Sequence, residues 1–64
     1  MSKIYTSNEL IKIVEKDGWY LVHVHGSHHK FKHPLKKGIV VIPHPKREIP
    51  TGTANNILMQ AGLK

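Results

Sequence analysis

The chain has 64 residues, and ten lysines and arginines against four aspartates and glutamates give it a formal net charge of +6 at pH 7. This length allows one small domain with a modest core, because a domain of this size buries only about 60% of its unfolded surface. The absence of cysteine excludes disulfide scaffolds, zinc ribbons, iron–sulfur sites and thiol nucleophiles. No run of about 18 apolar residues and no signal-peptide core are present, so we expect a cytoplasmic protein that does not span a membrane.

A capping box opens the first predicted helix. Thr6 and Glu9 have the T-x-x-E spacing in which each side chain accepts a hydrogen bond from a backbone N–H at the start of a helix. An apolar stripe follows within residues 10–14, and Asp17-Gly18 stops the periodic pattern. The sequence therefore predicts a helix over about residues 7–17.

Three short strands are predicted next. Residues 19–25 are rich in aromatic and β-branched side chains, and a two-residue Gly-Ser turn connects them to residues 28–33. The apolar run at residues 39–42 ends at a proline, which fits the last strand of an antiparallel meander. We expect an exposed loop over residues 44–48.

A second helix is predicted over about residues 53–61, after Pro50, with Thr51 or Thr53 as its cap and Gly62 beyond its end. The α-β-β-β-α order predicts a single α+β domain over residues 1–64. Two helices would pack on one face of a three-stranded antiparallel sheet and leave the other face open.

Metal binding is one chemistry that the histidines suggest. His23 and His25 lie two apart on a predicted strand, so they share a face with their Cα atoms about 7 Å apart. Closed zinc sites usually have four ligands, however, and the four carboxylates lie on a helix, at its end and in a remote loop. We therefore expect no metal and no other cofactor, and we interpret His23, His25 and His33 as ordinary polar strand residues.

His28 is different because it directly follows the Gly-Ser turn and alternates with Lys30 and Lys32. These three side chains share one face of an extended strand, whereas His29, Phe31 and His33 point to the other face. An imidazole base beside ammonium groups is what a metal-independent ribonuclease requires. A solvated basic strand that binds phosphate but catalyses no reaction would show the same alternation of histidine and lysine.

Several segments in order resemble the HicA toxin family, also described as YcfA-like mRNA interferases. The segments are Gly18-Trp19, G-S-H-H-K-F at residues 26–31, V-I-P-H-P at 41–45, P-T-G-T at 50–53 and I-L-M-Q-A-G-L at 57–63. The resemblance covers nearly the whole chain. It implies a fold like that of double-stranded-RNA-binding domains, ribonuclease activity against mRNA, and neutralisation by a HicB-like antitoxin.

The resemblance also assigns residues. The catalytic histidine of the family directly follows Gly-Ser, which makes it His28 here, and His44 matches the histidine of the V-x-P-H segment. We expect His28 to act as general base or acid, and we expect the following residues to contact RNA or support the site: Ser27, Lys30, Lys32, His44, Lys46 and Arg47. The pattern does not assign a general acid to work with His28.

Two other functions remain compatible with the sequence. A non-catalytic RNA-binding module could have the same fold, because fold does not determine activity. A protein-interaction domain could use the cationic face only to dock an acidic partner. For the main hypothesis the partners are mRNA and the antitoxin, and the toxin alone is expected to be a monomer.

Overall fold

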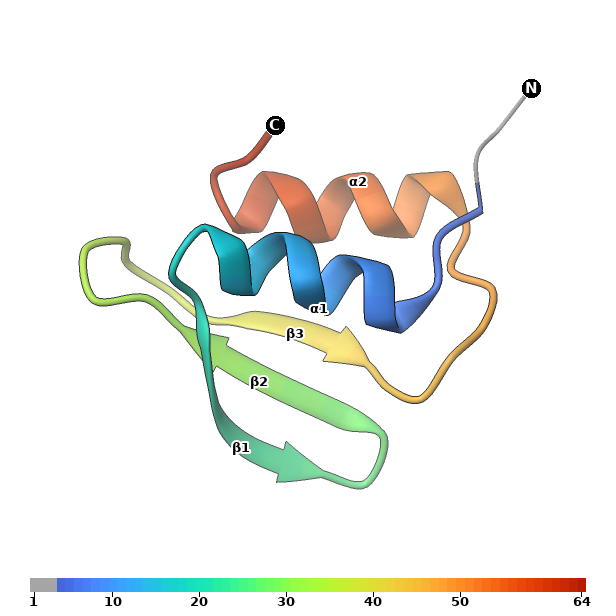
Figure 1. Ribbon diagram of the computed structural model, residues 1–64, viewed down its shortest axis with the longest axis horizontal. Helices are drawn as coiled ribbons and strands as arrows, with labels where there is room; N and C mark the ends of the chain where they lie inside the picture. The colour runs from blue at the N-terminus through green and yellow to red at the C-terminus, as the bar shows by residue number, and fades with distance from the viewer. Residues whose placement is uncertain (1–3) are drawn as a thin grey trace.

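A computed structural model describes residues 4–64 of the chain. The elements are α1 (Ser7–Lys16), β1 (Tyr20–His25), β2 (His28–Lys32), β3 (Val40–Pro43) and α2 (Thr51–Gln60), as Figure 1 shows. The strands form one antiparallel sheet in the order β1-β2-β3. The predicted α+β class and the α-β-β-β-α order are therefore confirmed.

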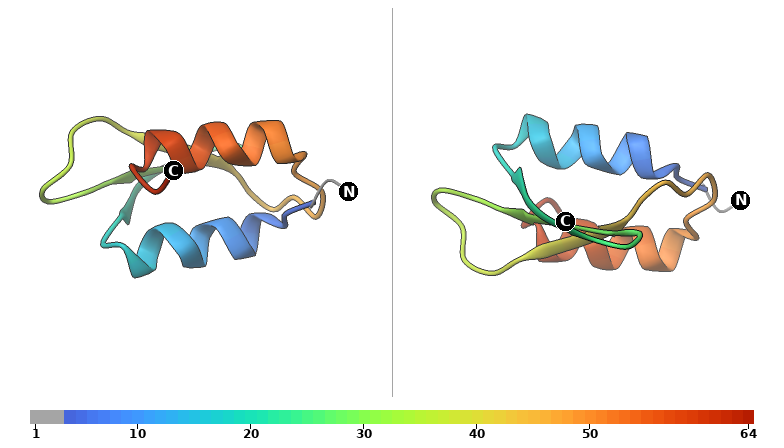
Figure 2. Two further views of the ribbon diagram at one scale, coloured as in Figure 1. Left: turned by 90° about the horizontal axis from the view of Figure 1, so that it is seen from above. Right: turned by 90° about the horizontal axis from the view of Figure 1, so that it is seen from below.

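Both helices lie on the same face of the sheet (Figure 1, Figure 2). Each of them contacts β3 and the other helix, whereas β1 is the strand farthest from them in Figure 1. All six residues of β1 are exposed. No helix within residues 4–64 is long and apolar enough to cross a membrane.

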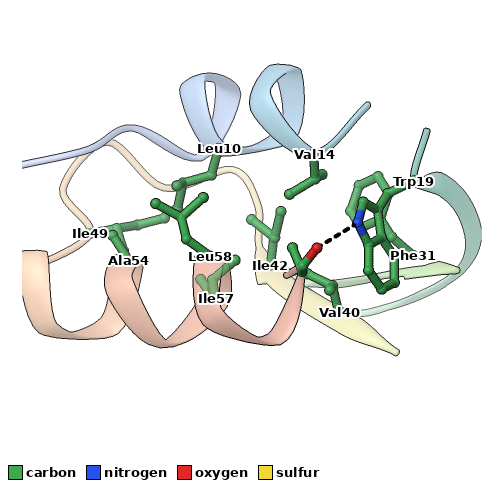
Figure 3. Close-up of a cluster of buried hydrophobic side chains, with 11 residues drawn as sticks. Leu10, Val14, Trp19, Phe31, Val40, Ile42, Ile49, Ala54, Ile57 and Leu58 are labelled. Atoms are coloured by element: carbon green, nitrogen blue, oxygen red, sulfur yellow. Dashed lines mark hydrogen bonds between the residues drawn. The ribbon is translucent and has the colours of Figure 1, made fainter. Parts of the chain in front are cut away.

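The core lies between the helices and the covered face of β2 and β3 (Figure 3). Trp19 is 2% exposed, and its indole N–H donates to the carbonyl of Ala61 over 3.3 Å, which connects the start of the sheet to the end of α2. The buried apolar residues are Leu10, Val14, Trp19, Phe31, Val40, Ile42, Ile49, Ala54, Ile57, Leu58 and Ala61. Burial of each large apolar side chain contributes about 1.5–3 kcal/mol to the stability of the fold.

The helix ends differ in how well they were predicted. The capping box of α1 is confirmed, since Thr6 Oγ1 accepts the Glu9 N–H and the Glu9 carboxylate accepts the Thr6 N–H. The predicted cap of α2 by Thr51 or Thr53 is wrong. That helix begins at Thr51, two residues early, and its N-cap position is Pro50, which makes no side-chain capping bond. Proline fits at a helix start because no intrahelical N–H bond is lost there.

The segment before α2 is more buried than predicted. Ile49 is fully buried and forms an isolated bridge with Tyr5, with backbone N···O distances of 3.1 and 2.7 Å. In the loop predicted to be exposed, Lys46 and Arg47 are exposed, but His44 is half-buried. The bridge joins the chain before α1 to the chain before α2 and so holds this loop against the domain.

Candidate nucleic-acid interface

The β1–β2 hairpin is closed by a two-residue turn at Gly26-Ser27. Gly26 has a φ of 58°, and no non-glycine residue in the described part of the chain has a positive φ. A single left-handed residue at the first central position is typical of a type II′ turn, which favours glycine there. The turn places His25 and His28 directly opposite each other as the last pair of the hairpin.

A β-bulge in β1 decides which side chains reach the open face of the sheet. Leu21 pairs with Phe31, but the next paired residue is His23, opposite Lys30, so Val22 is an extra residue in the strand. Because paired residues share a face, the turn places His23 and His25 on the side of Lys30, and the bulge then puts Tyr20 on this side and Leu21 on the side of Phe31. Sequence reasoning missed this bulge, and the residues around Val22 give no signal for it.

We use the name open face for the side of the hairpin that the helices do not cover: Tyr20, His23, His25, His28, Lys30 and Lys32. All of these residues are exposed except Lys30, which is half-buried. The rings of His23 and His25 stack, with centroids 6.3 Å apart and planes 14° apart. None of the three strands contains an acidic residue. The open face therefore combines imidazoles and ammonium groups and suits an anionic ligand.

The predicted alternation along β2 is confirmed. Phe31 is 1% exposed and lies in the core, whereas His28 and Lys32 are exposed. The structure thus places His28, Lys30 and Lys32 on one surface of the sheet.

The other side of the hairpin carries a second group of polar residues, the Ser7 cluster, made of Ser7, His29 and His44. Ser7 is 2% exposed, and its Oγ lies 2.7 Å from His44 Nδ1 and accepts the backbone N–H of Lys46 over 2.9 Å. The Ser7 hydroxyl donates to His44 Nδ1 when the ring proton is on Nε2, and accepts from it when the proton is on Nδ1. The rings of His29 and His44 meet edge to face at 4.9 Å.

His44 lies on the helix-covered side of the sheet, beside His29. His29 alternates with His28 and therefore lies on the helix-covered side, and His44 packs against His29 there. The Nδ1 atom of His29 is buried and has no hydrogen-bond partner among the described residues. His44 and His28 are thus close in the fold but lie on opposite sides of the sheet, so they do not form one acid–base pair.

The remaining predicted contacts lie near the same end of the sheet. The carbonyl of Ser27 accepts the backbone N–H of His44 over 2.7 Å, so the loop after β3 lies beside the hairpin turn, as Figure 1 shows. The structure therefore brings Lys46 and Arg47 of this loop toward the end of the hairpin that carries His28. Both side chains are exposed.

His33 is a structural residue just after β2, whereas the sequence suggested an ordinary polar residue within the strand. Its Nδ1 accepts the backbone N–H groups of Leu35 and Lys36 over 3.0 and 3.2 Å, so its Nε2 donates to the Asp17 carbonyl over 2.7 Å. The ring also meets Trp19 edge to face at 5.3 Å. His33 joins the end of α1 to the turn after β2, at the opposite end of the sheet from Gly26.

Within residues 4–64, no three histidine, aspartate or glutamate side chains are placed so that they could hold a metal ion together. The two stacked imidazoles of His23 and His25 are the closest approach to such a group on the open face.

A three-stranded antiparallel sheet with two helices on one face defines a small α+β protein with a fold like that of double-stranded-RNA-binding domains. Residues 7–63 match the family model described as the HicA toxin of bacterial toxin-antitoxin systems. The chain belongs to the HicA toxin family, and the resemblance stated from its motifs is confirmed. No curated protein matches the chain. Membership of a toxin-antitoxin family implies an antitoxin partner.

Proposed function

We propose that this HicA-family toxin is an endoribonuclease that cleaves mRNA in the cytoplasm, with His28 as its catalytic histidine. One observation carries the proposal: the exposed imidazole of His28 shares the open face with Lys30 and Lys32, and the strands of this sheet contain no acidic residue. An exposed imidazole can take up a proton from a substrate, and the lysines can bind the phosphates on either side.

The reaction uses the 2′-hydroxyl of the RNA as nucleophile. His28 removes the 2′-hydroxyl proton, and the 2′ oxygen attacks the adjacent phosphorus. Lys30 and Lys32 stabilise the negative charge that develops on the pentavalent phosphorane. The P–O5′ bond then breaks, and the products are a 2′,3′-cyclic phosphate and a 5′-hydroxyl end.

Substrate analogues test this function. The purified toxin should cleave single-stranded RNA in excess chelator, should yield a 2′,3′-cyclic phosphate, and should not cleave DNA or 2′-O-methyl RNA. Loss of cleavage in EDTA that zinc or magnesium restores would contradict the metal-independent mechanism. Binding of RNA without any cleavage would instead identify a non-catalytic RNA-binding module.

The antitoxin is proposed to cover the catalytic surface. Inhibition is simplest if the partner presents carboxylates to the open face, because these would neutralise its charge and exclude RNA from His28. Hydrogen exchange of the complex should show protection of residues 26–32 relative to the free toxin. Protection limited to α1 and α2 would show that the antitoxin inhibits in another way.

A further inference from the structure

The proposed cleavage needs a second proton transfer, because the leaving 5′ oxygen must receive a proton while the 2′-hydroxyl loses one. One imidazole cannot serve both oxygens in the same step. The histidines outside the open face cannot donate this proton, since His33 uses both ring nitrogens within the fold, and His29 and His44 lie on the helix-covered side. The partner of His28 must therefore come from the open face itself.

We infer that His25 is the general acid that works with His28. The two residues are direct cross-strand partners at the closing pair of the hairpin, and both are exposed. Side chains opposite each other on one face of an antiparallel pair have Cβ atoms about 4.5–5.5 Å apart. Two imidazoles at this separation can contact two oxygens of a single phosphodiester. This inference rests on the proposed ribonuclease function and names a second residue for the same site.

The two-residue turn supports the assignment, because it fixes His25 directly opposite His28. The bulge at Val22 lies beyond His23 and places Tyr20 on the open face, so it leaves this pairing unchanged. His23 lies two pairs farther from the turn, opposite Lys30 and not opposite His28, so it is less well placed to reach the same phosphate.

The groups that face His25 are all neutral or cationic. His23 stacks against it on β1, and His28 and Lys30 face it from β2. Farther across the sheet, β3 contributes only the uncharged Val41 and Pro43 to this side, which pair with Lys30 and His28. No carboxylate competes with the substrate phosphate for these cations within the sheet.

The step is balanced in protons. Neutral His28 takes the 2′-hydroxyl proton as the 2′ oxygen forms its bond to phosphorus, and protonated His25 gives its Nε2 or Nδ1 proton to the 5′ oxygen as the P–O5′ bond breaks. The pair ends with the charge moved from His25 to His28. His28 then gives its proton to water and His25 takes one up from water, which restores the starting protonation states. No metal or other co-reactant is consumed.

A leaving group that needs no proton tests the assignment. A mixed-sequence RNA is first used to map one cleaved bond, and the 5′ bridging oxygen of that bond is then replaced by sulfur. A thiol ionises near pH ~8.5 and leaves as a thiolate without a general acid. His25→Ala should cleave the ordinary RNA about 10²–10⁴-fold more slowly than the wild type and should regain nearly the wild-type rate on the sulfur-containing RNA. His28→Ala should remain slow on both substrates.

Val24→Ala is the matched control, because Val24 is also exposed on the same strand but faces the other side. This variant should cleave both substrates at the wild-type rate.

A second measurement is the pH profile of kcat/KM. His25→Ala should lose the fall in kcat/KM at high pH, since that limb reports the acid that must be protonated. A wild-type rate for His25→Ala on ordinary RNA, or an equal loss on both substrates, would overturn the role of His25. If the wild type cleaves neither RNA, the proposed function fails, and the assignment fails with it.

Discussion

His28 and His29 are neighbours in the sequence, yet they lie on two surfaces of the hairpin with different physical properties. On the open face, His28 is exposed and has His25 opposite it and Lys30 next along the strand. On the helix-covered side, His29 is half-buried against His44, whose Nδ1 lies 2.7 Å from the Ser7 hydroxyl. The alternation of a strand therefore separates imidazoles that can meet a substrate from imidazoles that hold the fold together.

The largest expected effect is on the open face. His28→Ala should lower the cleavage rate by about 10²–10⁴-fold while leaving the melting temperature nearly unchanged, because an exposed imidazole contributes little to the core. Single-turnover cleavage and circular dichroism of the same sample would measure both quantities. A folded His28→Ala protein that cuts RNA at the wild-type rate would show that the catalytic group lies elsewhere.

The next effect is on stability and comes from the helix-covered side. Ser7→Ala removes the hydroxyl that accepts the Lys46 N–H and contacts His44, which leaves two polar groups in a part-buried place without their partner. We expect a loss of about 1–3 kcal/mol in the free energy of unfolding, measured with urea.

Asn8→Ala is the control for Ser7→Ala, since Asn8 is the next residue of α1 and is exposed. It should change the urea midpoint much less. An unchanged midpoint for Ser7→Ala would mean that the Ser7 cluster does not stabilise the fold. If both variants keep the wild-type rate per folded molecule, the two sides of the hairpin have separate roles.

The sequence predicted features that depend on neighbours along the chain. The capping box at Thr6 and Glu9 and the alternation along β2 were both correct, because helix starts and strand faces follow local spacing. The start of α2 was missed because two threonines within the first turn looked like better caps than Pro50.

Contacts between residues far apart in the sequence could not be predicted from local spacing. Ser7 and His44 are 37 positions apart, and nothing in their local patterns shows that they meet. The bulge at Val22 depends on the register with β2, and the bonds of His33 depend on where α1 ends. The candidate catalytic histidine came from a motif. Its cross-strand neighbour His25 follows from the predicted two-residue turn, but it became a candidate only when the structure placed His29, His33 and His44 away from the open face.

A smaller effect separates binding from chemistry on the open face. Replacing Lys30 and Lys32 together by alanine should weaken RNA binding broadly across sequences. It should also flatten the slope of log K against log salt by about 0.7 for each phosphate of single-stranded RNA that the variant no longer binds. Filter binding at several salt concentrations would measure the slope.

The matched control for the two lysines is the double variant Lys12→Ala, Lys37→Ala, which removes the same charge from exposed positions on α1 and on the turn after β2. Its slope should stay closer to that of the wild type. Equal slopes for both double variants would mean that net charge, and not the open face, determines binding.

The smallest effect concerns the end of the sheet away from the hairpin turn, where acid should act on the fold and not on the site. A hydrogen bond from Lys36 holds the pKa of Asp17 below its ordinary value of 3.8, with further help from the charge of Lys36 and from Trp19, against a partial burial that raises it. A carboxyl whose pKa is lower in the folded state stabilises the fold fully above its ordinary pKa, and this contribution is lost as the pH falls through the lowered value. Asp17→Asn should therefore reduce stability at neutral pH slightly, because the pair is partly exposed, and should make urea unfolding less sensitive to pH below about 4.

Glu15→Gln, which removes a carboxylate from the exposed surface of the same helix, is the control for Asp17→Asn. If Asp17→Asn keeps the wild-type loss of stability in acid, the Asp17–Lys36 pair is not its source, and if it changes the cleavage rate of the folded protein at pH 7, this end of the sheet is coupled to the open face after all.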